Sequence, residues 1–250
     1  NISFAQSFGK NKVQYDDFKW SYIQTKHFDI YFYEGGKDLA IFAAPIAEEQ
    51  IKRITSILNW RMRKRTSLII YNSHSDFQQT NVVLDYLTEG TGGFTELFKN
   101  RAVVPFDGNY HEFWHVIRHE LLHVVINDMI YGGNIQSIIS GRVKLRIPLW
   151  MNEGFAEYIS MGWDTHADLI MRDVALNNDI PDIKNLDYYM AYKGGQSVYR
   201  YVADKYGVEK IGEIWSQMKS RGDFEKGFKS AIGMGTKDLT KKWQRWLRNL

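Results

Sequence analysis

The chain has 250 residues, of which 44% are hydrophobic, 15% aromatic and 24% charged, and its formal net charge is +3. This length and composition are typical of a folded, enzyme-sized unit and exclude a disordered or low-complexity protein. Because cysteine is absent from the sequence, disulfides, thiolate metal sites and a cysteine nucleophile are excluded as well.

Residues 1–105 predict an N-terminal α/β subdomain. Residues 26–33 are rich in aromatic and β-branched side chains and lead to a glycine pair, as is typical of a strand. Apolar residues recur at helical spacing over 40–58, and 67–71 then has the pattern of a buried strand. Two further short strands are predicted within 92–106. Together these elements predict a mixed sheet that starts with a β-α-β unit and has an edge strand.

Residues 106–250 predict a mainly helical subdomain. The pattern indicates a histidine-rich helix to about residue 128, a second helix over 149–161, and several short helices from residue 164 onward. The two subdomains are expected to form one α+β domain, with the functional groove between them.

Histidines in the first of these helices share one face. Four of the seven histidines recur at steps of four residues: His111, His115, His119 and His123. Each step advances by only about 40° around a helix, so the side chains point the same way and suit a metal ion. The pattern His-Glu-x-x-His occurs at 111–115 and again at 119–123. The first copy follows a turn signal, whereas apolar residues flank the second, which therefore provides the preferred ligands, His119 and His123.

This spacing matches the chemistry of a catalytic zinc site. Two imidazoles one helical turn apart can offer nitrogens to one Zn²⁺ at about 2.0 to 2.1 Å. Glu120 can act as the general base that takes a proton from a water whose pKa the metal lowers to about 7. A catalytic site needs a third protein ligand and one open position, while a purely structural site needs four ligands, for instance by recruiting His115.

A resemblance indicates the third ligand. Residues 150–156, Trp-Met-Asn-Glu-Gly-Phe-Ala, resemble the second zinc signature of the aminopeptidase N family within the gluzincins. In that family the Glu of the Asn-Glu-Gly triplet is the third ligand, which implies this role for Glu153. The spacer between His123 and Glu153 is longer here, and its extra residues, including 132–134 and 140–142, are expected to form a loop near the site.

Two neighbours of Glu153 are expected to support the ligands. Glu157 lies one helical turn further on and can accept the second N–H of a ligating histidine, although it is also the alternative third ligand. Asn152, the first residue of the triplet, is expected to support the site as well.

Residues 192–198, Tyr-Lys-Gly-Gly-Gln-Ser-Val, are similar to the Tyr-x-Lys-Gly-Ala segment of the same family. The tyrosine of that segment donates to the oxyanion, which implies this role for Tyr192. The neighbouring Tyr188 and Tyr189 are the alternatives, and a core tyrosine without a catalytic role is a third reading.

The expected substrate strand is less similar to that of the family. The place of the family's substrate-binding edge strand is taken by Gly92, Gly93, Phe94, Thr95 and Glu96. The glutamate that recognises a free α-amino group in the family aligns with Thr95, and Glu96 comes one residue later, on the other side of a strand. Endopeptidase and aminopeptidase activity therefore both remain open.

Most of the chain also resembles bacterial peptidase-MA-like domains, which are often exported. The resemblances imply a gluzincin fold with one Zn²⁺ between the two halves, and hydrolysis of a peptide or protein substrate that lies along the edge strand. The alternative function is a non-catalytic module that keeps this fold and binds a peptide or protein.

The sequence also carries expectations about partners and location. No stretch approaches the roughly 18 apolar residues that span a bilayer, so no transmembrane segment is expected. The basic clusters at 61–65 and 241–248 lie on predicted helices, where cations are typical of solvated faces, so no nucleic acid is expected. Residues 3–5 resemble the end of a secretory signal, which favours a periplasmic or extracellular location. Such domains are sometimes followed by a further domain, so the resemblance is compatible with one beyond Leu250.

Overall fold

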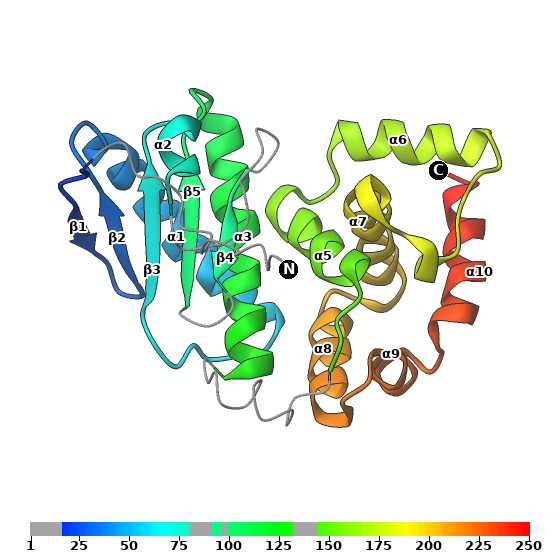
Figure 1. Cartoon of the computed structure of the whole chain (residues 1–250). Helices are drawn as coiled ribbons and strands as arrows, with labels where there is room; N and C mark the ends of the chain where they lie inside the picture. Colours follow the sequence, from blue (N-terminus) through cyan, green and yellow to red (C-terminus); the bar gives the residue numbers. More distant parts are fainter. Residues whose placement is uncertain (1–16, 81–91, 97–99, 133–144) are drawn as a thin grey trace, which may run out of the picture.

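The computed structural model in Figure 1 describes residues 17–80, 92–96, 100–132 and 145–250. Its five-stranded sheet has the order β1-β2-β3-β5-β4. The strands are β1 (Ser21–Gln24), β2 (Phe28–Phe32), β3 (Thr66–Tyr71), β4 (Phe94–Glu96) and β5 (Arg101–Pro105). The three central strands are parallel, and β1 and β4 pair antiparallel to them at the two edges.

The predicted β-α-β start is confirmed. Helix α1 (Lys37–Ile57) connects the parallel strands β2 and β3, and it buries Ala40, Ala43, Ala47, Ile51 and Ile54. Their spacing of three or four residues produces one apolar face, which packs on the sheet. The sequence did not indicate β1 or the short helix α2 (His74–Gln78). The α+β class and the mixed sheet with an edge strand are also confirmed.

Helix α3 (Tyr110–Tyr131) begins and ends at clear capping residues. The Asn109 side chain accepts hydrogen bonds from the backbone N–H groups of His111 and Glu112, and Gly132 closes the other end with a left-handed φ of 65°. The next helix that the structure describes, α5 (Leu149–Met161), has the predicted bounds. The chain continues through α6 (Thr165–Leu176), η1 (Ile183–Asn185), α7 (Tyr188–Tyr206), α8 (Glu209–Arg221), α9 (Phe224–Ile232) and α10 (Thr236–Leu247).

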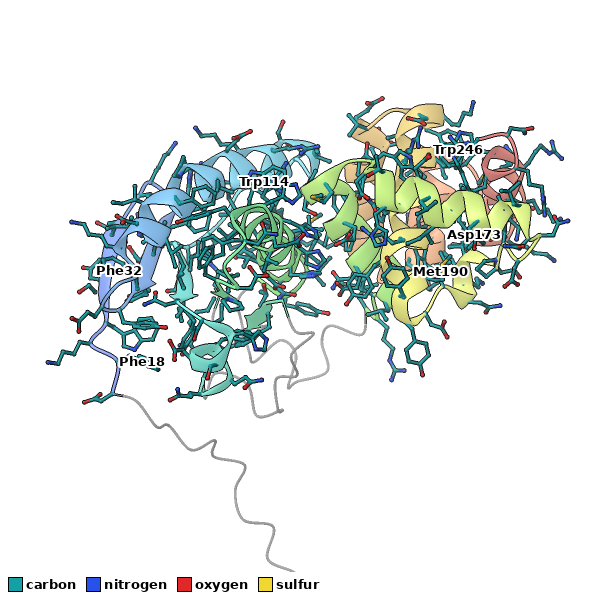
Figure 2. The ribbon with its side chains drawn as sticks, turned by 90° about the horizontal axis from the view of Figure 1, so that it is seen from above. Phe18, Phe32, Trp114, Asp173, Met190 and Trp246 are labelled. Carbon is teal, nitrogen blue, oxygen red and sulfur yellow. The ribbon has the colours of Figure 1, made fainter. Side chains whose placement is uncertain are left out.

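The helices divide between the sheet and a separate helical group. Figure 2 shows α1 on one face of the sheet and α2, with Phe18, on the opposite face. Helix α3 contacts α1, β4 and β5 on one side and α5 on the other, so it lies between the sheet and the helical group in Figure 1. One buried apolar cluster includes residues of the sheet, α3 and the helical group. The predicted division into subdomains at residue 105 remains a prediction.

Three further expectations concern a transmembrane segment, the loop before α5 and the signal-like segment near the start of the chain. Within the described ranges, no helix is both long enough and apolar enough to cross a membrane. The predicted loop of 132–134 and 140–142 lies outside the described residues except for Gly132, and so does the signal-like segment 3–5.

Helices α5 and α7 cross in direct backbone contact. A Cβ atom added to Gly154 would lie 2.4 Å from the Cα atom of Gly195, and one added to Gly195 would lie 2.4 Å from the backbone oxygen of Trp150. No side chain fits at this crossing, so glycine is required by the close approach of the two helices. The crossing sets how α7 is placed against the residues of α5.

Gly154→Ala is therefore expected to destabilise the protein. Alanine is favoured over glycine within a helix by about 1 kcal/mol. Overpacking has the opposite effect and costs about 1 to 3 kcal/mol, or more where the added atom clashes with backbone atoms that cannot move aside. We expect a net loss of about 2 kcal/mol or more in the free energy of unfolding, to be measured by urea denaturation. An unchanged or higher midpoint would contradict the close crossing.

Candidate functional site

A cavity of about 510 Å³ opens between β4 and helices α3, α5 and α7. Its lining consists of Gly92, Gly93, Phe94, Thr95, His115, Val116, His119, Glu120, His123, Glu153, Glu157 and Tyr192. Most of the side chains singled out in the sequence therefore surround one cavity, although they come from four separate elements.

Helix α3 supplies three histidines to the cavity. The ring centroids of His115 and His119 are 5.9 Å apart, and those of His119 and His123 are 5.0 Å apart, as expected for side chains one turn apart on one face. His111 lies in the first turn, with its side chain 66% exposed, and is absent from the lining. Of the first motif copy, only His115 reaches the cavity.

Three ligand atoms converge beside the second motif copy. Nε2 of His119 lies 3.2 Å and Nε2 of His123 lies 3.4 Å from Oε2 of Glu153. Ligands at about 2.0 to 2.1 Å from a tetrahedral ion are about 3.3 to 3.4 Å from one another. The spacing and the nitrogen and carboxylate donors therefore fit a metal ion bound by these three residues. Nδ1 of His123 is buried and has no hydrogen-bond partner among the described residues.

Glu157 joins two of the histidines to a lysine. Its Oε1 atom lies 3.0 Å from Nδ1 of His119 and 3.1 Å from Nε2 of His115, and its Oε2 accepts a 2.6 Å hydrogen bond from Nζ of Lys193. A proton on Nδ1 of His119 satisfies the first contact and leaves the lone pair of Nε2 facing Glu153. Glu157 thus lies behind His119, as a carboxylate that orients a metal-binding imidazole does.

The carboxylates make this site favourable for positive charge. Burial alone would lower the pKa of His119, but hydrogen bonds to Glu153 and Glu157 and the nearby charge of Glu120 raise this pKa to about 10. Burial would likewise raise the pKa values of Glu153 and Glu157, but their histidine partners hold them far below their usual range. A metal ion would replace the proton on Nε2 of His119, the nitrogen that faces Glu153.

Glu120 is held against strand β4. The side chain is buried, with 6% of the residue exposed, and its Oε2 accepts a 2.8 Å hydrogen bond from Oγ1 of Thr95. A Cβ atom at Gly93 would lie 2.9 Å from Val116 and 3.1 Å from Cγ of Glu120, so this strand lies directly on α3. The edge strand and the proposed general base therefore form one side of the cavity.

Tyr192 of α7 also lines the cavity and lies beside His119. Its ring is nearly parallel to that of His119, with centroids 6.2 Å apart, and it is partly buried. Burial and the charges of Glu153 and Glu120 raise the pKa of Tyr192 to about 12. The hydroxyl therefore keeps its proton at neutral pH and can donate a hydrogen bond into the cavity.

The two alternative tyrosines are placed differently. Tyr188 is 85% exposed and Tyr189 is 49% exposed, and neither belongs to the cavity lining. The hydroxyl of Tyr189 instead lies 3.3 Å from Nε2 of His166. Among the three, only Tyr192 lies beside the candidate metal ligands.

Two of the expected site residues do not line the cavity. The Glu96 carboxylate accepts a 2.7 Å hydrogen bond from Nε of Arg101 on the neighbouring strand. Asn152 donates to Oε1 of Glu153 at 3.3 Å and so contacts a candidate ligand from outside the cavity. Lys193 was missed by the sequence reasoning, because no motif assigned it a role; it lies outside the cavity lining but donates a hydrogen bond to Glu157. A lysine directly before two glycines was the available signal, but its partner lies on another helix.

Comparisons with known proteins place the chain in a family. Residues 46–249 match the Peptidase MA superfamily. The uncharacterized protein YhcO of Bacillus subtilis (strain 168) is 32% identical over 113 residues, which cover 39% of this chain and 33% of that relative. The family match confirms the resemblance to peptidase-MA-like domains, while the closer likeness to the aminopeptidase N family remains a prediction. Because the match covers most of the chain and the whole cavity lining, the chain belongs to the Peptidase MA superfamily.

Proposed function

We propose that this chain is a zinc metallopeptidase that hydrolyses peptide bonds. The observation that carries the proposal is the convergence of His119, His123 and Glu153, with contacts of 3.2 and 3.4 Å, in a cavity that also contains Glu120. Two histidines and one glutamate with an open position are a donor set of catalytic zinc. A structural site would need a fourth ligand, but the fourth ligand suggested by the sequence, His115, is already engaged with Glu157.

Glu120 is the proposed general base. Zinc held by the three ligands would supply a water of lowered pKa and polarise the substrate carbonyl. Glu120 would accept a proton from the water that attacks the carbonyl carbon, and would return this proton to the amine that leaves when the C–N bond breaks. The 2.8 Å hydrogen bond from Thr95 supports this role, because it orients the carboxylate before substrate binds.

The proposed substrate is an extended peptide paired with β4. This strand is one of the two edge strands of the described sheet and hydrogen-bonds to β5 on one side, so its other edge can pair with a peptide backbone. Recognition of a free α-amino group would need a carboxylate beside it. In the described part of the chain, the lining carboxylates are the proposed ligand Glu153, the proposed base Glu120, and Glu157, which is occupied by two histidines and a lysine. Glu96 is paired with Arg101. An endopeptidase is therefore favoured over an aminopeptidase.

Metal analysis combined with cleavage of a mixed peptide library tests the proposal. We expect one zinc ion per chain and cleavage within peptides whose N-termini are either free or acetylated. A chelator should stop the reaction and added zinc should restore it. Zinc binding without cleavage of any peptide would instead support the non-catalytic binding module, and absence of zinc binding would overturn both the metal site and the proposed chemistry.

Tyr192→Phe is expected to lower kcat while leaving KM nearly unchanged. The substitution keeps the ring beside His119 but removes the hydroxyl that would donate to the oxyanion developing on the substrate carbonyl. Loss of one such donor lowers kcat by about 10²- to 10³-fold.

The matched controls are Tyr188→Phe and Tyr189→Phe, which alter exposed tyrosines on the same helix. Measurements of kcat, KM and melting temperature separate catalysis from stability. If one of the controls alone showed the catalytic loss, the role would belong to that tyrosine. If all three variants turned over normally, no tyrosine of this helix would stabilise the oxyanion.

A further inference from the structure

Lys193 is a buried cation to which the proposed hydrolysis assigns no step. Its side chain is 10% exposed, and its Nζ atom lies 2.6 Å from Oε2 of Glu157 and 3.5 Å from Oδ2 of Asp164. Because a buried ammonium group is costly without a close partner, the short contact makes Glu157 its main partner. These charges raise the pKa of Lys193 although burial would lower it, so the ammonium is retained.

The same carboxylate is bound on its other side by the histidines of α3. Oε1 of Glu157 contacts Nδ1 of His119 at 3.0 Å and Nε2 of His115 at 3.1 Å, while Oε2 is taken by Lys193. Both oxygens are therefore occupied, and the plane of the carboxylate is set by groups from two different helices. If Lys193 were absent, Glu157 would keep its histidine contacts but lose the group that prevents its rotation.

We propose that Lys193 is a positioning residue of the metal site, which fixes Glu157 so that His119 donates through Nδ1 and presents Nε2 to the metal. The inference rests on the proposed function, because it concerns the metal ligand His119. Groups that orient metal-binding histidines contribute about 10- to 100-fold to metal affinity.

Lys193 also explains why a second cluster of possible metal ligands does not need a second metal ion. Atoms of His115, His119 and Glu157 lie close enough together to hold an ion. The ammonium of Lys193, 2.6 Å from Glu157, already supplies a positive charge there. One metal ion with a lysine behind its ligands is therefore the arrangement that the contacts support.

A purely structural role is the competing explanation. Lys193 and Gln196 of α7 both contact Asp164, which caps the first turn of α6. Asp164→Asn removes the charge but keeps a side chain that can cap a helix. This variant therefore disturbs the outer partner of Lys193 without touching Glu157.

The test is the zinc affinity of the full chain, measured by competition with a chelator. We expect Lys193→Met to weaken zinc binding by about 10- to 100-fold. In a Glu157→Gln background, where the ion pair is already lost, the same substitution should change the affinity by less than about threefold, since two residues that act through one contact are not additive. Asp164→Asn should leave zinc affinity within about threefold of the original chain.

The outcomes separate this inference from the proposed function. If the original chain bound no zinc, the proposed function itself would fail. If it bound one zinc ion and Lys193→Met bound zinc as tightly, or if Lys193→Met had the same effect with and without Glu157, the positioning role alone would be wrong. If Lys193→Met did not fold, Lys193→Ala, which also removes the donor to Glu157, would take its place, and unchanged affinity would overturn the inference.

Discussion

Glu120→Gln is expected to reduce peptide hydrolysis on the order of 10²- to 10⁴-fold while leaving zinc bound. Glutamine has the shape of glutamate and its amide oxygen can still accept the hydrogen bond from Thr95, which is 2.8 Å long in the structure. It cannot take up a proton from water, so the chemical step is lost while the fold and the ligands remain.

Glu112→Gln is a matched control for this substitution. Glu112 holds the same place in the first motif copy, but its side chain is 53% exposed and lies outside the cavity lining. We expect its kcat to equal that of the original chain. Unchanged turnover in Glu120→Gln would remove Glu120 from the mechanism, and loss of zinc from that variant would make Glu120 a ligand. Initial rates and zinc content, determined on the same preparations, distinguish these results.

Glu153→Ala is expected to lower zinc affinity by more than about 100-fold, which is the upper range for residues that only support a ligand. Oε2 of Glu153 lies within 3.4 Å of both histidine Nε2 atoms, and the Glu153 side chain is 12% exposed. Its removal leaves two neutral nitrogens, which hold Zn²⁺ weakly without a third ligand.

His111→Ala is the control for this substitution. The side chain of His111 is 66% exposed and lies near Glu112, so its loss should leave zinc affinity unchanged. Zinc content after dialysis against a chelator, together with the dissociation constant, provides the measurement. If His111→Ala lost the metal and Glu153→Ala retained it, the wrong copy of the motif would have been chosen.

Local sequence signals predicted those helices and strands whose own residues, or the residues that flank them, mark where the element begins and ends. Helix α5 has the predicted bounds because Pro148 precedes it and Gly162, with a φ of 73°, ends it. Strand β2 was visible from its run of aromatic and β-branched residues. Strand β1 was missed because most of its residues are exposed, so it shows no alternation of apolar and polar side chains.

Contacts between distant segments were beyond any local signal. Thr95 contacts Glu120, and Lys193 contacts Glu157, but each pair joins two separate elements. Sequence spacing sets distances only within one helix or strand, so it carries no information on which of the many threonines or lysines will meet a given carboxylate.

The sequence by itself determined that His115, His119 and His123 share a face, because four residues are close to one turn of any α-helix. It also carried the family motifs. The family resemblance pointed to Tyr192 but left Tyr188 and Tyr189 as alternatives, and only the tertiary structure decided which of these tyrosines of α7 lies at the cavity. That choice depends on the rotation of α7 about its own axis.

The physical cause of this rotation is the backbone contact between α5 and α7. Gly154 and Gly195 leave no space for a Cβ atom, so these two glycines fix the point at which the two helices cross. With α7 held there, Tyr192 lies beside His119 and Lys193 reaches Glu157. Packing of the two helices, rather than any property of the residues alone, therefore assembles this side of the site.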